Sequence, residues 1–458
     1  MLAAALMPYA WIESPAILLQ GYTRLLTNRD SSCSIVTSPK QRLFSTGYRD
    51  SAGQLTVSAS QTSAIVSILS AGTFFGALTA APIAGLIGRK LGLILSTTVF
   101  ILGVILQTAA TAIPLFLAGR FFAGFGVGLI SALVPLYQSE TAPRWIRGVI
   151  VGAYQFSIAD GLLLAATVNN AIKDRNDTGS YRIPIAVQFM WAIILIVGML
   201  VFPETPRYLI KKGNFDGTRK SLASLRRLPH DDQAIIQEMA EIRANHESKL
   251  SLGDAIYWDC FKGRLLKRLL TGCCLQGLQP LTGINFIFYY GTYLFERSGF
   301  HNSFVITLIT SCVAVGSTLP GLWAVELPTQ KAAISFICIY IFFFAASWVV
   351  TGEIFPLKVR AKSLSMTTAT NWLFSWALAY STPYLVNYGP GNANLQSKIF
   401  FVSGGACLIC IVFQVDELYS VMPRTEEGRP PFIDDYYLLA FSGQRSRQES
   451  VCGPGGET

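Results

Sequence analysis

Apolar stretches long enough to cross a lipid bilayer run through most of this chain. Residues 91–122 and 183–202 are two examples. A helix needs roughly 20 mostly apolar residues to cross the hydrocarbon core, and soluble folds rarely contain one such stretch. Charged residues make up 14% of the 458 residues, whereas a soluble domain carries about 25%. The sequence therefore predicts an all-α membrane protein with many spans.

The apolar segments fall into two groups, which predicts two helix bundles. A polar region at residues 203–262 separates the groups, and we expect it to be a soluble linker with a helix near 231–248. The segments lie at 63–87, 91–113, 115–137, 148–170 and 184–202 in the first group, and at 269–294, 304–324, 332–350, 364–386 and 399–415 in the second.

The same pattern divides the whole chain into five parts. Residues 1–50 form an atypical N-terminal segment, since Pro8, Glu13 and Pro15 interrupt its apolar start. The remaining parts are a first bundle over 51–202, a helical linker over 203–262, a second bundle over 263–415, and a tail over 416–458. The tail is polar and contains Gly and Pro, so we expect it to be disordered.

The basic residues predict which helix ends face the cytoplasm. Lys and Arg concentrate at Arg89 and Lys90, at Arg144 and Arg147, and in the linker. Cytoplasmic loops carry an excess of Lys and Arg, so these regions are expected to be cytoplasmic. The loop with the glycosylation sequon at Asn176 should then lie outside. This placement explains the formal charge of +9 without nucleic acid as a partner.

The sequence offers no pattern for catalysis or metal binding. The nine Cys are scattered, mostly within apolar segments, and the three His show no ligand spacing. We find no nucleotide-binding loop and no nucleophile motif. We therefore expect neither enzymatic activity nor a cofactor.

The string Glu-x-x-Pro-x-x-x-Arg occurs once in each bundle. It runs from Glu140 to Arg147 in the first copy and from Glu353 to Arg360 in the second. Each copy follows an apolar segment at a predicted cytoplasmic end. A duplicated bundle is the simplest cause, and many secondary transporters are built in this way.

Glycine residues concentrate between Leu117 and Gly128. Glycine at every second to fourth position removes side chains from one helix face, so neighbouring helices can approach closely. Two further pairs with GxxxG spacing predict similar contacts: Gly72 with Gly76, and Gly148 with Gly152.

Arg120 lies within this glycine-rich segment, near the predicted outer end of its helix. A charge at such a position is costly unless it is paired or solvated. We therefore expect Arg120 to have a functional role or a fixed ion pair.

Several strings together resemble the signature of the sugar porters in the major facilitator superfamily. Residues 135–148 read PLYQSETAPRWIRG and follow the glycine-rich segment, and residues 203–207 read PETPR. Residues 279–290, which read QPLTGINFIFYY, resemble the seventh helix of the family, and Asn371-Trp372 resembles its eleventh. The resemblance extends over residues 44–415 and is strongest to fungal monosaccharide transporters.

This resemblance implies two six-helix bundles around a central sugar site that opens alternately to each side. A sugar site needs amides, which both donate and accept hydrogen bonds, beside apolar surface. By resemblance, the sugar-contacting residues are Gln155, Gln279, Asn285 and Asn371, with Tyr290 and Trp372 as apolar surface. The charge network of the cytoplasmic gate comprises Arg89, Glu140, Arg147, Glu204, Arg207, Glu353 and Arg360.

The chain departs from the family pattern at single positions and by whole segments. Gly85 and Pro280 stand where the family has a gate Asp and a second sugar-binding Gln, and no counterpart of the acidic residue in its first helix is visible. Ala314 and Ser375 replace Asn at two sugar-facing positions. After Glu326 the ninth helix is missing, and the twelfth is truncated. The sequence thus predicts about 10 of the usual 12 spans.

The function implied by the resemblance is transport of a monosaccharide, a hexose, across the plasma membrane. The family implies symport with protons by a monomer in the lipid bilayer, but loss of the acidic residue makes facilitated diffusion an equal alternative. Two readings from another class also stay open. In the first, the chain is a non-transporting sugar sensor. In the second, it is an inactive remnant or an incomplete gene model.

Overall fold

The computed structural model describes residues 59–110, 112–143, 147–172, 179–251, 257–261, 263–281 and 359–386, together with short stretches near 283, 305–312, 355, 405 and 409. Helices account for nearly all of these residues. The sequence prediction of an all-α chain is confirmed for this part.

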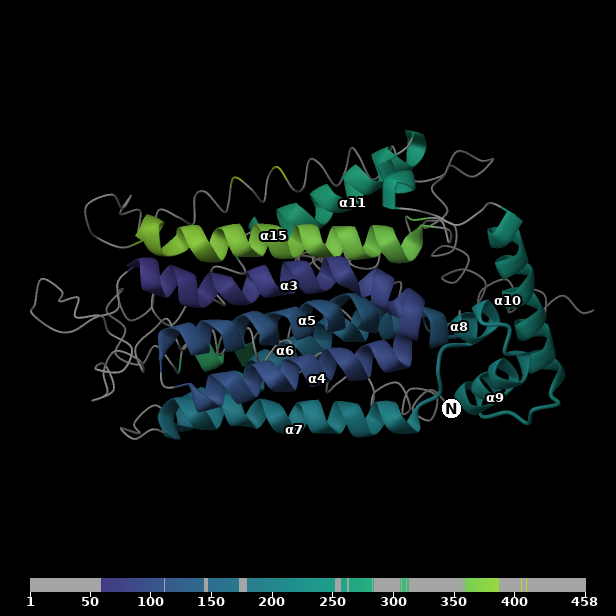
Figure 1. Cartoon of the computed structure of the whole chain (residues 1–458), viewed down its shortest axis with the longest axis horizontal. Coiled ribbons are helices and arrows are strands. Elements are labelled where there is room, and N and C mark those ends of the chain that lie inside the picture. The colour runs from purple at the N-terminus through teal and green to yellow at the C-terminus, as the bar shows by residue number, and fades with distance from the viewer. Residues whose placement is uncertain are drawn as a thin grey trace, which may run out of the picture.

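In the part that the structure describes, the first bundle contains five long helices, which run alongside one another (Figure 1). They are α3 (Ala59–Ile87), α4 (Arg89–Ala109), α5 (Ile113–Thr141), α6 (Arg147–Ala171) and α7 (Gly179–Val201). Each coincides with a predicted apolar segment. Among the described residues, four stretches are long and apolar enough to cross a membrane: Ser63–Ile87, Arg89–Ala109, Ile113–Thr141 and Arg182–Val201. The sequence predicts about ten spans, and several of them lie partly or wholly outside the described part.

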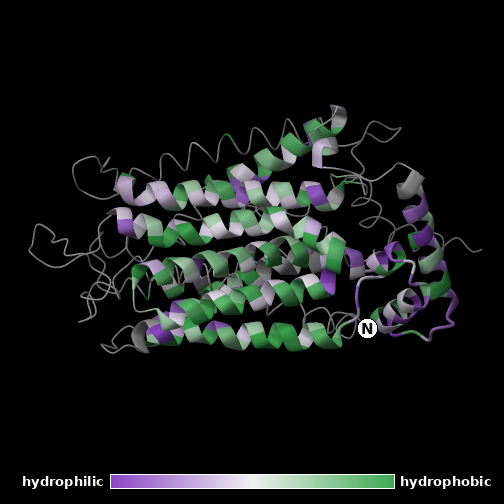
Figure 2. Ribbon diagram, in the orientation of Figure 1, coloured by the Kyte–Doolittle hydropathy of each residue, from purple (hydrophilic) through white to green (hydrophobic). Residues whose placement is uncertain are grey.

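The linker folds into further helices at one end of the bundle (Figure 1). They are α8 (Pro206–Lys211), α9 (Phe215–Arg226), α10 (Gln233–Ser251) and the 3₁₀ turn η2 (Tyr257–Phe261). Helix α10 confirms the predicted helix near 231–248. Figure 2 shows hydrophilic residues gathered on these helices, whereas apolar residues dominate the long ones. We call this end of the molecule the linker end.

Two long helices from the second half of the chain complete the described fold. Helix α15 (Arg360–Val386) packs along α3, and α11 (Gly263–Leu281) packs against α15 (Figure 1). The contact between α3 and α15 therefore joins the two halves of the chain.

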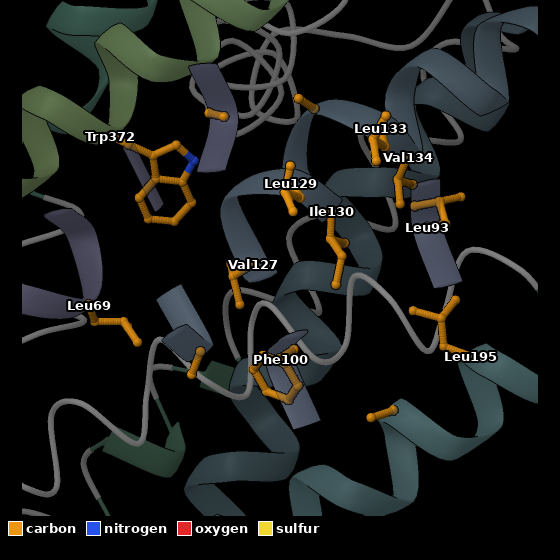
Figure 3. Packing of buried hydrophobic residues seen from close by; sticks show 14 of the residues in the cluster. Leu69, Leu93, Phe100, Val127, Leu129, Ile130, Leu133, Val134, Leu195 and Trp372 are labelled. Carbon is orange, nitrogen blue, oxygen red and sulfur yellow. The ribbon is translucent and has the colours of Figure 1, made fainter. Parts of the chain in front are cut away.

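Helix α5 lies at the centre of the apolar core. Its residues Leu129, Ile130 and Leu133 are at most 1% exposed and pack with residues of α3, α4, α6 and α7. Trp372 of α15 belongs to the same cluster. Figure 3 shows Trp372 at one edge of the cluster and Leu195 of α7 at the other.

Glycines bring α3 and α5 into backbone contact. A Cβ atom added at Gly76 would lie 2.2 Å from the carbonyl oxygen of Phe125, and one added at Gly128 would lie 2.2 Å from that of Thr73. Real Cβ atoms do not approach an oxygen so closely. A Cβ atom at Gly72 would likewise lie 2.3 Å from the carbonyl oxygen of Phe121, so the close-packing interpretation of the glycine pair in α3 is confirmed.

The glycines of α5 occupy two helix faces, not the one face that the sequence suggested. Gly124 and Gly128 face α3, whereas a Cβ atom at Gly126 would lie 2.8 Å from Phe100 of α4. Gly119 likewise faces Gln107 of α4. The expectation of a single face was wrong because α5 packs against both neighbours at once.

We predict that Gly76→Ala lowers the melting temperature of the purified protein in detergent. Inserting a methyl group into a tight contact costs about 1–3 kcal/mol, which exceeds the ~1 kcal/mol that alanine gains over glycine in a helix. The matched control on the same helix is Gly85→Ala, since no atom lies within 4 Å of a Cβ there. Equal melting temperatures for the two variants would contradict the close contact.

Candidate functional site

Three amide side chains meet between α11 and α15. Gln276 and Gln279 are three positions apart on α11 and so share one helix face. The Nδ2 atom of Asn371 on α15 donates to Oε1 of Gln279 at 2.8 Å and lies 3.1 Å from Oε1 of Gln276. All three side chains are buried, with at most 6% exposed. The structure thus brings together two residues that the resemblance assigns to the sugar site, Gln279 and Asn371.

Pro280 shapes this amide cluster through the backbone. A proline has no N–H group, so the carbonyl four residues earlier, that of Gln276, loses its helical partner. Asn371 Nδ2 donates to this carbonyl oxygen at 2.9 Å. The residue that replaces a family glutamine therefore supplies an acceptor in place of a side-chain amide.

Trp372 connects the amide cluster to the first bundle. Its Nε1 atom donates to Oγ of Ser131 on α5 at 3.3 Å, and its side chain is 1% exposed. The neighbouring Asn371 points to α11 instead. The cluster therefore lies beside the junction between the two halves of the chain.

Sequence reasoning missed Gln276 and Ser131. Their side chains lie 3.1 Å and 3.3 Å from Asn371 and Trp372, respectively. The available signal for Gln276 was its spacing of three from Gln279, which puts both amides on one helix face. That this face meets Asn371 follows only from the position of α15. Ser131 carried no signal in the sequence, because serine is common in packed membrane helices.

Other predicted site residues lie partly or wholly outside the described part. Gln155 lies on α6, and Arg147 and Arg360 begin α6 and α15, but the positions of these three side chains are outside the described residues. Asn285, Tyr290 and Glu353 lie outside the described residues altogether.

An ion pair joins the start of α4 to the end of α5 at the linker end. The Nη2 atom of Arg89 lies 2.8 Å from Oε1 of Glu140. Their side chains are 12% and 6% exposed, so little water screens the two charges. The structure thus pairs two members of the predicted charge network.

Glu204 caps the N-terminus of α4 from the linker. Its carboxylate accepts from the backbone N–H groups of Arg89 and Lys90, each at 3.1 Å. A carboxylate there satisfies free backbone donors and complements the positive end of the helix dipole. Gly88 makes room for it: its φ is +96°, and a Cβ atom would lie 2.4 Å from Oε2 of Glu204.

Arg226 ties the linker to α5, which the sequence did not predict. Its Nη1 atom donates to the carbonyl oxygen of Thr141 at 2.9 Å, and its Nη2 atom pairs with Oε1 of Glu238 on α10 at 2.5 Å. The predicted network residue Arg207 is half-buried at the start of α8. The linker is therefore fastened to the bundle at α4 and α5.

Arg120 is held on α5 away from the linker end. Its Nη1 atom donates to the carbonyl oxygen of Ile65 on α3 at 3.2 Å, and its guanidinium carbon lies 5.0 Å from the ring centre of Phe116. Only 3% of Arg120 is exposed. The partners that the structure gives Arg120 thus include a backbone carbonyl and an aromatic ring, whereas the sequence suggested a functional role or an ion pair.

Asp160 is an acidic residue that the sequence reading passed over. Among the long helices that the structure describes, it is the acid that lies away from the helix ends, near the middle of α6. An ionisable residue inside a membrane helix costs free energy and usually has a function.

Among the described residues, no group of three or more His, Cys, Asp or Glu is placed to hold a metal ion.

Comparison with protein families places the chain among transporters. The family model described as "Sugar (and other) transporter" matches residues 31–332 and 328–419. The two matches meet where the sequence predicts a missing ninth helix. Major facilitator-type transporter ecdD of Aspergillus rugulosus is 58% identical over 490 residues, which cover 95% of this chain and 89% of that protein. This alignment is longer than the chain, so parts of that relative have no counterpart here.

Two further relatives and one solved structure are also similar to this chain. Probable glucose transporter rco-3 of Neurospora crassa is 44% identical over 84% of this chain and 75% of its own length. High glucose sensor RGT2 of Saccharomyces cerevisiae is 36% identical over 83% of this chain and 55% of its own length. The proton:xylose symporter XylE bound to 6-bromo-6-deoxy-D-glucose is 20% identical, with a TM-score of 0.73 over 90% of this chain and 95% of that chain. The fold is that of the major facilitator superfamily.

We predict that the variants of Arg89 and Glu140 are not additive. Removing one partner of a buried pair leaves an uncompensated charge and costs about 3–5 kcal/mol, whereas removing both costs less. The double variant Arg89→Gln with Glu140→Gln should therefore melt at a higher temperature than either single variant. Melting in detergent measures this, and a double variant whose loss equals the sum of the single losses would refute the pairing.

Proposed function

Because the chain belongs to the sugar transporter family of the major facilitator superfamily, we propose that it carries a monosaccharide across a membrane by alternating access. The observation that carries this proposal is the buried cluster of Gln276, Gln279 and Asn371 between α11 and α15. It lies beside Trp372, which bonds to the other bundle.

The chemistry of the amide cluster suits a sugar. Each amide has two donor hydrogens and an acceptor oxygen, and Asn371 donates to the Gln279 side chain and to the Gln276 carbonyl. Sugar hydroxyls can exchange with these bonds without leaving a buried polar group unsatisfied, which otherwise costs about 1–3 kcal/mol. The indole of Trp372 adds apolar surface. We propose that Gln155, Asn285 and Tyr290 complete the site.

A hexose is the substrate that the relatives support. The relative rco-3, which is 44% identical, is named a probable glucose transporter. The high-affinity hexose transporter HXT6 of Saccharomyces cerevisiae is 31% identical. The solved structure of XylE holds a deoxyglucose derivative. The substrate of ecdD is not part of its name, so the choice among sugars follows from the more distant relatives.

We propose that the protein lies in the plasma membrane and works as a monomer. Its linker end then faces the cytoplasm. The linker helices and the paired residues Arg89 and Glu140 lie at this end, and basic residues concentrate there. The network of Arg89, Glu140, Glu204 and their partners then closes the cytoplasmic gate when the site faces outward.

Coupling to protons requires a group that binds a proton within the membrane, and we propose Asp160 for this role. Among the described helices, α6 packs mainly against α5 and α7. Their charged residues, Arg120, Glu140 and Arg182, lie towards the helix ends, whereas Asp160 lies near the middle of α6. Facilitated diffusion is the alternative if Asp160 does not bind the coupled proton.

Sugar sensing is the second candidate, because RGT2, a glucose sensor, is 36% identical. A sensor binds a sugar without carrying it. An inactive remnant neither binds nor carries one. Uptake and binding measured on the same chain therefore separate the three functions.

We predict that the chain restores uptake of labelled D-glucose in yeast cells that lack their own hexose transporters. Asn371→Ala should reduce uptake by about tenfold or more, the effect of leaving the buried partners of a lost hydrogen bond unsatisfied. Gln237→Ala, which removes an exposed amide from α10, should have no effect. Normal surface expression without uptake would refute the proposal.

Asp160→Asn tests the coupling in the same cells. If the chain is a symporter, this variant should abolish the rise in uptake that follows acidification of the external medium. It should keep the exchange of labelled for unlabelled sugar, since exchange needs no net proton movement. Wild-type uptake that is insensitive to external pH and to a protonophore would instead establish facilitated diffusion.

A further inference from the structure

Pro82 interrupts the hydrogen-bond ladder of α3 in its last turns. Because proline has no N–H group, the carbonyl of Leu78, four residues earlier, loses its helical donor. In a membrane helix such a carbonyl must find another donor within the protein. The position of Pro82 therefore creates an acceptor on α3 near the linker end.

Two hydroxyl groups from outside the first bundle occupy this region of α3. The hydroxyl of Tyr257, in the turn η2, donates to the carbonyl oxygen of Leu78 at 3.1 Å. The hydroxyl of Ser365, on α15, donates to the carbonyl oxygen of Ala77 and lies 3.3 Å from that of Leu78. The linker and both halves of the chain thus meet at two adjacent carbonyls.

The turn η2 belongs structurally to the second half of the chain. Cys260 in this turn packs with Leu269, Phe355 and Val359, and its sulfur lies 3.5 Å from the hydroxyl of Ser363 on α15. Lys362 Nζ lies 5.4 Å from the ring centre of Tyr257. Tyr257 should therefore move with α15, and its bond to α3 is a contact between the bundles.

The opposite end of the same helix pair carries a matching contact. The hydroxyl of Ser63 on α3 donates to the carbonyl oxygen of Tyr380 on α15 at 2.6 Å. Helices α3 and α15 are therefore hydrogen-bonded near both ends. Alternating access requires that one end opens while the other stays closed.

We propose that the carbonyls of Ala77 and Leu78 form a socket for Tyr257 and Ser365, and that this contact sets how readily the transporter opens at the linker end. The inference rests on the proposed function, since it assumes that the bundles separate in turn at each end. Tyr257 and Ser365 act as positioning residues: they contact α3 and not the sugar. Burial raises the pKa of Tyr257, so its hydroxyl remains a donor at neutral pH.

Hydrogen–deuterium exchange of the full chain in detergent tests this proposal without sugar or introduced labels. Tyr257→Phe keeps the ring but removes the donor, and should speed exchange at the linker ends of α3 and α15 by about fivefold, the effect of losing one typical hydrogen bond on an equilibrium. Exchange at their opposite ends should slow. Ser365→Ala should act in the same direction.

Ser63→Ala is the matched control, because it removes a single hydroxyl donor from the other end of the same helix pair. It should shift exchange in the opposite sense. Faster exchange at both ends in all variants would mark a general loss of stability and overturn the proposal, as would exchange like that of the wild type.

Pro82→Ala tests the origin of the socket. The alanine N–H restores a helical partner to Leu78, so Tyr257→Phe should change exchange less in this background than in the wild type. An equal change in both backgrounds would overturn the role of Pro82. Opposite shifts in a chain that shows no sugar uptake would support the contact between the bundles while refuting the proposed function.

Discussion

Every backbone carbonyl of a membrane helix must find a donor within the protein, and at two prolines of this chain the donor comes from another segment. Pro280 removes the helical partner of the Gln276 carbonyl, and Asn371 of a neighbouring helix supplies the donor. Pro82 does the same for Leu78, and a linker tyrosine supplies the donor. At these two places, the amide cluster and the contact near the linker end, a polar contact between helices thus forms beside a proline.

The two kinds of helix contact have different mechanical consequences. Within the first bundle, glycines let α5 approach α3 and α4 so closely that a methyl group does not fit. Such contacts depend on shape along whole helices and hold the bundle as a rigid body. Between the halves of the chain, α15 packs along α3, and hydrogen bonds from Ser63 and Ser365 join the two helices towards opposite ends. These bonds can break one end at a time, as transport by rocking bundles requires.

The sequence predicted the long helices well, because the thickness of the bilayer fixes the length of an apolar segment. The short helices α8 and α9 escaped notice, since they have too few turns for a clear apolar period. Glu204 was predicted as a gate charge, but its cap on α4 was not predicted, because it depends on a fold that brings Glu204 next to Gly88. Gln276 was missed because one amide among many gains meaning only when α15 places Asn371 opposite it.

The most direct test of the sugar site is the melting temperature of the purified chain with and without D-glucose. A ligand that binds the folded state stabilises it by RT ln(1 + [L]/Kd). D-glucose should raise the melting temperature in a concentration-dependent way, L-glucose should not, and Gln276→Leu should weaken the response. Equal melting temperatures with D-glucose, L-glucose and other hexoses at high concentration would contradict a monosaccharide site at this amide cluster.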